Sequence, residues 1–199
     1  MAGAVKRITI PIGARMGAVF VVLLLAALVA GAVAAGFLLF QHGNMPGAAL
    51  LFGLAAALTV MLFFVLRDCM AKLFWSVTVQ RDGARLFLPA WRSLRHHRED
   101  FSGRIAYSGL KAIEMQPETY RQFGFETTVH TYWLVLMVGG RILLAEDREV
   151  NRRGDHTSFG KRAAEAIADA SGKKLVQRRA QVGKAGVLGI WGAKPPVPN

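Results

Sequence analysis

Hydrophobic and polar positions divide the chain near residue 67. No Asp, Glu, Lys or Arg occurs between Met16 and Leu66. Two apolar runs in this stretch, residues 17–40 and 45–66, are each long enough as a helix, at about 1.5 Å per residue, to cross a hydrocarbon core of about 30 Å. The polar segment between them, residues 41–44, has room only for a tight turn. The pattern therefore predicts a transmembrane helical hairpin over residues 17–66.

Small residues recur at a spacing of four on both predicted helices, which allows two helix backbones to approach closely. The predicted packing face consists of Ala27, Gly31, Ala35, Ala49, Gly53 and Ala57. Neither span contains an acidic or basic side chain of the kind that proton relays and ion paths need. The hairpin is therefore interpreted as an anchor and not as a pump, channel or transporter.

After the second helix, apolar side chains alternate with polar ones, which is typical of strands with one buried face. Residues 75–80 form the first predicted strand, and Asp82-Gly83 supplies a hairpin turn that accommodates positive φ. Further strands are predicted at residues 85–90, 105–115, 132–138 and 141–145, with a tight turn at Gly139-Gly140. Pro117 is expected to end the strand before it because proline has no N–H to donate. Loops are expected at residues 91–102 and 117–126.

The helical period returns over residues 158–172, where Ser158 is a suitable N-cap and Gly172 a suitable C′ residue. The remainder is basic and is expected to be extended. The sequence thus predicts an α+β membrane protein: a transmembrane hairpin, then an antiparallel β meander closed by one C-terminal amphipathic helix. The predicted divisions are a basic arm (1–16), the hairpin (17–66), a β domain (67–175) and a basic tail (176–199).

This order of elements resembles bacterial membrane proteins that carry a two-helix anchor and a pleckstrin-homology-like (PH-like) domain. The resemblance rests on Val77-Thr78-Val79 with Asp82-Gly83, residues 105–114, Tyr132-Trp133-Leu134 with Gly139-Gly140-Arg141, and the helix 158–171. It implies a PH-like barrel, the bacterial inner membrane, and a role as a membrane-bound scaffold or accessory subunit. It assigns no functional residue.

The formal net charge is +12, and its distribution predicts the orientation of the hairpin. Lys6, Arg7 and Arg15 precede the first helix and Arg67 follows the second, whereas the turn has no basic residue. The positive-inside rule therefore predicts that both termini are cytoplasmic. A signal peptide cleaved after Ala32-Val33-Ala34 is the alternative, but the apolar run is too long for one and a second span follows.

The basic excess predicts contact with anionic lipid headgroups or with a membrane protein partner. The candidate contact residues are Arg92, Arg95, Arg98, Lys173, Lys174, Arg178 and Arg179. Positive-inside bias alone is the competing explanation of this excess. The sequence contains no recognisable RNA-binding motif, so nucleic acid is not an expected partner.

The candidate for chemistry is His96-His97-Arg98-Glu99-Asp100. Adjacent residues of an extended chain point to opposite sides, and nearby arginines repel a cation, so we expect a solvated basic loop without a metal. Nucleophile, phosphate-loop and zinc motifs are missing from the sequence. The predicted function is therefore non-enzymatic and cofactor-free. The alternative is a membrane enzyme that acts on a lipid-linked substrate through His96, His97 or Glu99, and convergence of these residues with His130 or His156 in a pocket would favour it.

Overall fold

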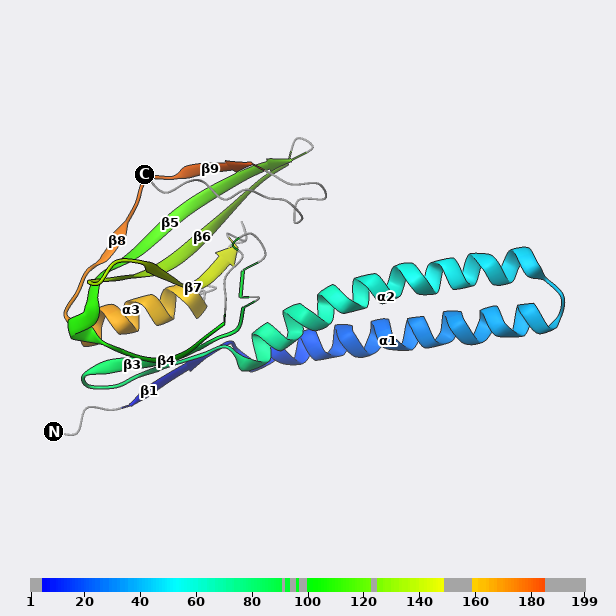
Figure 1. The fold of residues 1–199 in the computed structure, drawn as a ribbon, viewed down its shortest axis with the longest axis horizontal. Helices are drawn as coiled ribbons and strands as arrows, with labels where there is room; N and C mark the ends of the chain where they lie inside the picture. The colour runs from blue at the N-terminus through cyan, green and yellow to red at the C-terminus, as the bar shows by residue number, and fades with distance from the viewer. Residues whose placement is uncertain are drawn as a thin grey trace. The chain divides into compact units, whose positions relative to one another are not determined.

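The computed structural model describes residues 5–90, 92–93, 96, 100–122, 125–148 and 159–184. These residues form two compact units (Figure 1). One unit is the helical segment Pro11–Leu73. The other contains the described residues of Met1–Ile10 and Phe74–Asn199. The second unit therefore consists of two segments that are separated in the sequence by the helices.

The helical unit is a hairpin of α1 (Ile12–Gln41) and α2 (Met45–Phe74). Both helices are long and apolar enough to cross a membrane, so the predicted helical hairpin is confirmed. Gly43 has a φ of 75°, and the Asn44 side chain accepts a hydrogen bond of 3.1 Å from the Gly47 N–H, which caps the start of α2. Beyond the apolar run, α2 continues through an Asp68–Lys72 ion pair of 2.6 Å.

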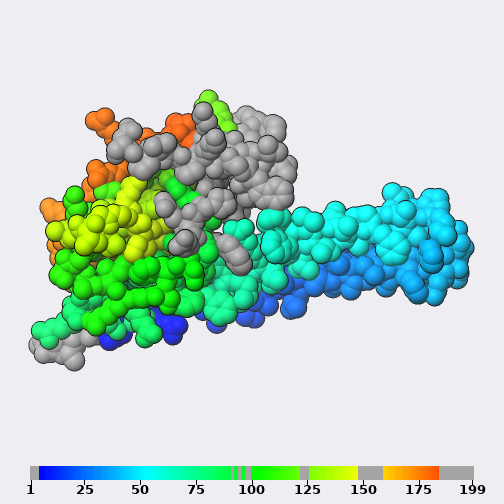
Figure 2. Space-filling view, in the orientation of Figure 1, coloured from blue at the N-terminus to red at the C-terminus, as the bar shows by residue number. Residues whose placement is uncertain are grey.

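The two helices lie side by side along their length (Figure 2). A Cβ added at Gly36 would lie 3.0 Å from the Phe52 ring, so this glycine faces α2. The buried positions of the apolar runs are Leu25, Ala32, Gly36, Ala48 and Ala55, and they follow the three-and-four spacing of a helix pair. A Cβ at Gly31 or Gly53 would meet open space. Among the residues of the predicted packing face, Ala35 is half-buried and the others are exposed. The predicted face is therefore not the one where α1 and α2 meet.

The first sheet has the order β1-β2-β3-β4, and all its neighbours are antiparallel. Its strands are β1 (Lys6–Thr9), β2 (Ser76–Val79), β3 (Gly83–Leu88) and β4 (Phe101–Ala106). β1 lies within residues 1–16, which were expected to form a basic arm. Ile8 and Ile10 are 6% and 5% exposed and join the core. The hairpin is therefore inserted between two neighbouring strands of one sheet.

The predicted β2–β3 hairpin is confirmed, but Gly83 has a different role from the expected one. Its φ is not positive; instead, a Cβ at this position would lie 2.5 Å from the Ile105 carbonyl oxygen. Glycine is required here because the backbone of β4 approaches closely.

The second sheet follows the 3₁₀ turn η1 (Tyr107–Gly109). Its strands are β5 (Leu110–Gln122), β6 (Phe125–Leu136), β7 (Arg141–Arg148), β8 (Leu175–Gln177) and β9 (Gln181–Lys184). The order is β7-β6-β5-β8, and β9 also pairs with β5. The strand containing Tyr132, β6, lies between β5 and β7. The predicted turn at Gly139-Gly140 is confirmed, with φ values of 89° and 85°.

Pro117 does not end its strand, and most of the loop expected at 117–126 belongs to β5 and β6. Pro117 pairs with His130 of β6. On the opposite edge of β5, the parallel pairing with β8 stops at Met115, and the parallel pairing with β9 begins at Glu118. The proline therefore coincides with an interruption between β8 and β9, where no parallel ladder needs its missing N–H.

The helix α3 (Phe159–Ser171) contacts strands of both sheets. Ala163 and Ile167 pack in a core with Val77 and Leu86 of the first sheet and Leu134 of the second. Gly172 has the expected positive φ, 68°. The expected N-cap, Ser158, lies outside the described residues; Asp147 of β7 accepts a hydrogen bond of 3.1 Å from the Lys161 N–H. The α+β class is confirmed, whereas the described strands form two sheets and not a closed barrel.

Candidate functional site

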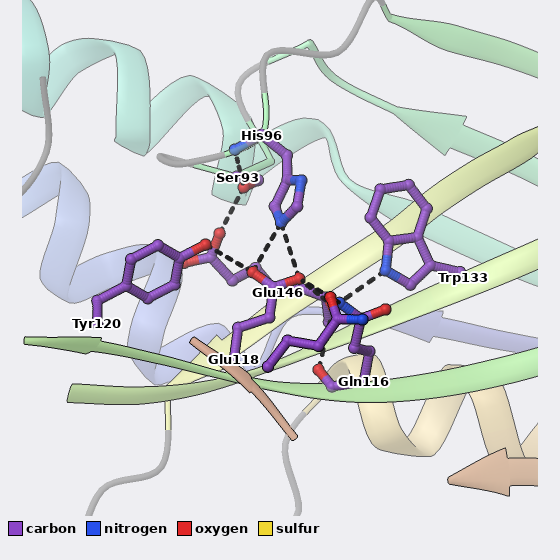
Figure 3. A network of polar contacts seen from close by, with 9 residues as sticks. Ser93, His96, Gln116, Glu118, Tyr120, Trp133 and Glu146 are labelled. Carbon is purple, nitrogen blue, oxygen red and sulfur yellow. Dashed lines mark hydrogen bonds and ion pairs between the residues drawn. The ribbon is translucent and has the colours of Figure 1, made fainter. Parts of the chain in front are cut away.

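Polar side chains are buried on the face of the second sheet opposite to Ile113, Met115 and Leu134 of the apolar core. Figure 3 shows how these polar side chains contact one another. They occupy every second position of β5, where Glu114, Gln116 and Glu118 are 5%, 6% and 0% exposed. Thr131 and Trp133 of β6 are buried on the same face: the Thr131 hydroxyl lies 3.0 Å from Glu118 Oε1, and Trp133 Nε1 donates to the Thr131 oxygen at 3.0 Å. The two-residue period of the strands thus gives the sheet one apolar and one polar buried face.

Glu118 is the centre of this polar cluster. His96 Nε2 lies 3.0 Å from Glu118 Oε1 and 2.9 Å from Oε2. The Tyr120 hydroxyl donates to Oε2 at 2.6 Å, and the Thr131 hydroxyl and Gln116 Nε2 lie 3.0 and 3.3 Å from Oε1. A carboxylate has about four acceptor positions. Its neighbours therefore occupy the carboxylate fully.

The environment of Glu118 favours its charged form. Burial alone would raise the pKa of this carboxyl, but hydrogen bonding and charge attraction from His96, with hydrogen bonds from Tyr120 and Thr131, outweigh burial and lower the pKa below its ordinary value. The carboxylate is thus stabilised as an anion inside the domain and is a poor base for removing a proton from a substrate.

The cluster also fixes part of the β3–β4 loop to the sheet. Ser93 donates a hydrogen bond to Glu146 of β7 and accepts one of 2.9 Å from the His96 N–H. The His96 ring packs edge-on against Trp133, with centroids 5.2 Å apart. Ser93 and His96 are each 6% exposed. The expectation of a fully solvated loop is therefore wrong at these two residues, because each finds buried polar partners on the sheet.

A second charged group lies beside this cluster on the same face. Arg178, which follows β8, forms an ion pair with Glu114 Oε1, and Arg141 Nη1 lies 3.8 Å from Oε2. The Arg141 guanidinium also stacks over Trp133, 5.1 Å from the ring centroid. The buried charge of Glu114 is thus balanced by one arginine of β7 and one of the tail.

The predicted contact residues have different surroundings. Arg92 is half-buried, and its Nε donates to the Leu143 carbonyl at 2.6 Å. Arg95 and Arg98 lie outside the described residues. Lys173 is half-buried, whereas Lys174, Arg178 and Arg179 are exposed. The role of these residues in binding stays a prediction.

The residues of the enzyme hypothesis are only partly described. His97, Glu99 and His156 lie outside the described residues, and His130 is on β6 in register with Pro117 and Asp147. Across the described ranges, no group of three His, Cys, Asp or Glu side chains could hold a metal ion.

Sequence reasoning missed Glu118 because this residue follows Pro117 in a segment interpreted as a loop. The alternation of Glu114, Gln116 and Glu118 was a usable signal, since three polar residues at a period of two indicate one face of a continuing strand. The pairing of His96 with Glu118 joins a loop to a distant strand and has no local signal.

No protein-family model, curated protein or solved structure matches the chain. The fold and the buried cluster therefore define its class by architecture: an α+β protein in which a hairpin of membrane-spanning length is inserted into a β domain.

Proposed function

We propose that this protein is a non-enzymatic integral membrane scaffold or accessory factor. Its anchored domain is PH-like and cytoplasmic, and it binds a membrane protein partner or anionic lipid at the bacterial inner membrane. The observation that carries this proposal is the insertion of the hairpin between β1 and β2, which are paired neighbours in one sheet.

The insertion supports an orientation with both termini on one side of the bilayer. Thr9 pairs with Ser76, so the strand leading into α1 and the strand leaving α2 meet at the same end of the sheet. A short connection at each helix end leaves little chain for crossing back through the membrane. The basic residues before α1 and in the last turns of α2 favour the cytoplasm for that side.

The strand order supports a PH-like domain. An antiparallel meander β1-β2-β3-β4 is followed by a second meander β5-β6-β7 and then by α3, which contacts β1, β2, β6 and β7. The resemblance implied an anchor, a meander and one terminal helix; β1, which precedes the anchor, is not part of that order. The parallel strands β8 and β9 are additional to it.

The β3–β4 loop is the proposed contact surface. Leu88 pairs with Phe101 at the end of the sheet where Phe87 pairs with Ser76, the first residue of β2 after α2. The loop thus leaves the sheet at the end connected to the anchor. Basic residues close to an anionic leaflet contribute about 1 kcal/mol each, so Arg95 and Arg98 are suited to contact headgroups or an acidic partner there.

The buried cluster favours this role over the enzyme alternative. Of the three residues in the enzyme alternative, the structure describes His96, which is 6% exposed and whose Nε2 lies 2.9 Å from Glu118 Oε2. That nitrogen is already engaged by a buried carboxylate, whereas a catalytic acid or base must reach the substrate. The cluster instead holds Ser93 and His96 of the β3–β4 loop against the second sheet.

Affinity purification of the tagged full-length protein from its native membrane in mild detergent tests the proposal. We expect an enriched membrane protein or anionic lipid, identified by mass spectrometry, and a several-fold loss with Arg95→Glu/Arg98→Glu. The matched control is Lys111→Glu/Lys161→Glu, which reverses two charges on β5 and α3. Neither partner nor lipid with the wild type, or equal loss in both variants, would contradict the proposal.

A further inference from the structure

The tail after α3 forms two short strands on the free edge of β5 (Figure 1). β8 pairs in parallel with Ile113 to Met115, and β9 pairs in parallel with Glu118 to Arg121. The two ladders are separated at Pro117. The edge of β5 is therefore covered by one continuous tail through two short, separate ladders.

The tail buries little of its own side-chain surface. Val176 and Val182 are 41% and 78% exposed, and the Arg178 side chain is 57% exposed. Of the apolar residues in β8 and β9, only Leu175 packs against the core. Hydrophobic burial provides most of the stability of packed segments. The tail is held instead by backbone hydrogen bonds and a few polar side-chain contacts, so it can exchange with another extended segment.

The contacts of the tail define what the edge of β5 recognises. Arg178 pairs with Glu114, and Gln116 Nε2 donates to Gln181 Oε1 at 2.8 Å. Gly183 lies against the Tyr120 ring, which a Cβ at that position would overlap. The edge therefore selects an arginine, and five residues later a glycine, in an extended segment parallel to β5.

We propose that this edge, residues 113–121 of β5, binds an extended basic segment of a partner protein by strand addition, and that β8 and β9 occupy the site in the isolated chain. The partner segment carries an arginine whose side chain pairs with Glu114 and, five residues later, a glycine opposite Tyr120. The proposal goes beyond the contact surface of the β3–β4 loop and does not depend on it.

Controlled release and locking of the tail test this site in the full-length protein in detergent. The probe is a fluorescent peptide of residues 173–184. Gly183→Val releases β9 by overlap with Tyr120, and we expect it to bind the peptide at least ten-fold more tightly than the wild type. Failure of this variant to bind while its tryptophan fluorescence stays native would overturn the proposal.

The lock is Thr119→Cys/Val182→Cys in a Cys69→Ser background. These residues are register partners in the β5–β9 ladder, and neighbouring strands lie about 4.8 Å apart, within the Cα range of a disulfide. We expect the oxidised form to bind the peptide at least ten-fold more weakly than the reduced form of the same protein. Equal binding by the two forms would overturn the proposal.

A charge exchange tests specificity. Glu114→Arg in the Gly183→Val protein should abolish binding of the natural peptide, and a peptide with Glu in place of Arg178 should restore it. Unchanged affinity after Glu114→Arg and after the replacement of Arg178 in the peptide would contradict recognition by Glu114. The Gly183→Val protein could also form a dimer. If the peptide dissociates that dimer, the edge binds a second copy of this chain, and the partner proposal is overturned.

Discussion

Both faces of the second sheet carry fully buried side chains, but these are stabilised in different ways. Leu134 is 1% exposed on the face packed against α3, and Glu118 is 0% exposed on the opposite face. The apolar face needs volume and shape, which several residues can supply. The polar face needs every partner of a buried carboxylate, since one missing partner leaves the others unpaired. The comparison predicts that conservative changes are tolerated on the first face and not on the second.

Glu118→Leu should produce the largest effect, because it removes the buried carboxylate that His96, Tyr120 and Thr131 contact. We expect a loss of about 3–5 kcal/mol in the free energy of unfolding, measured by tryptophan fluorescence of the full-length protein in detergent. Glu126→Leu is the control on the paired strand. Its side chain is 52% exposed in an ion pair with Arg121, and its loss should stay below about 1 kcal/mol. Equal losses would remove the distinction between the faces.

Leu134→Ala tests the apolar face. Removing these methyl groups from a buried site beside α3 should cost about 2–5 kcal/mol, while Leu134→Met should cost less than about 1.5 kcal/mol. Val138→Ala is the matched control, since Val138 is 94% exposed, and it should change stability by less than about 0.5 kcal/mol. A Met variant as unstable as the Ala variant would show that this face also demands one particular side chain.

Acidification should affect the polar face selectively. The pKa of Glu118 is lower in the folded protein than its ordinary value, so its contribution is complete above the unfolded pKa of about 4.3 and is lost as pH falls through the folded pKa. Unfolding free energies measured from pH 7 to pH 3 should therefore converge for the wild type and Glu118→Gln. Parallel curves for the two proteins would show that Glu118 does not supply this pH dependence.

Asp147 joins the edge of the sheet to α3, and its removal should have the smallest of these effects. Its carboxylate accepts the Lys161 N–H in the first turn of the helix, so Asp147→Ala should cost about 0.5–2 kcal/mol. Asp169→Ala is the control near the C-terminal end of α3, where the helix dipole disfavours a negative charge. It removes an exposed carboxylate and should be neutral or slightly stabilising. Thermal unfolding of both variants measures the difference, and a reversed order would contradict the cap.

The sequence predicted the features whose signals are local. The long apolar runs indicated α1 and α2, and the glycine pair at 139–140 indicated the β6–β7 turn. It did not predict β1, because Lys6–Thr9 pairs with residues on the other side of the hairpin. The polar face was missed although Glu114, Gln116 and Glu118 alternate at the period of a strand, because Pro117 was expected to end that strand. Pro117 is compatible with β5 because the parallel ladder is interrupted beside it. Such pairing is a property of the tertiary fold and has no periodic signature.

The central claim, a hairpin that crosses the bilayer and holds the β domain on the cytoplasmic side, is tested most directly by cysteine labelling in intact cells. In a Cys69→Ser background, His42→Cys reports on the turn between the helices, and Val138→Cys reports on the exposed β6–β7 turn. A membrane-impermeant maleimide should label residue 42 in intact cells and residue 138 only after permeabilisation. Labelling of residue 138 in intact cells, or of residue 42 only after permeabilisation, would contradict the account.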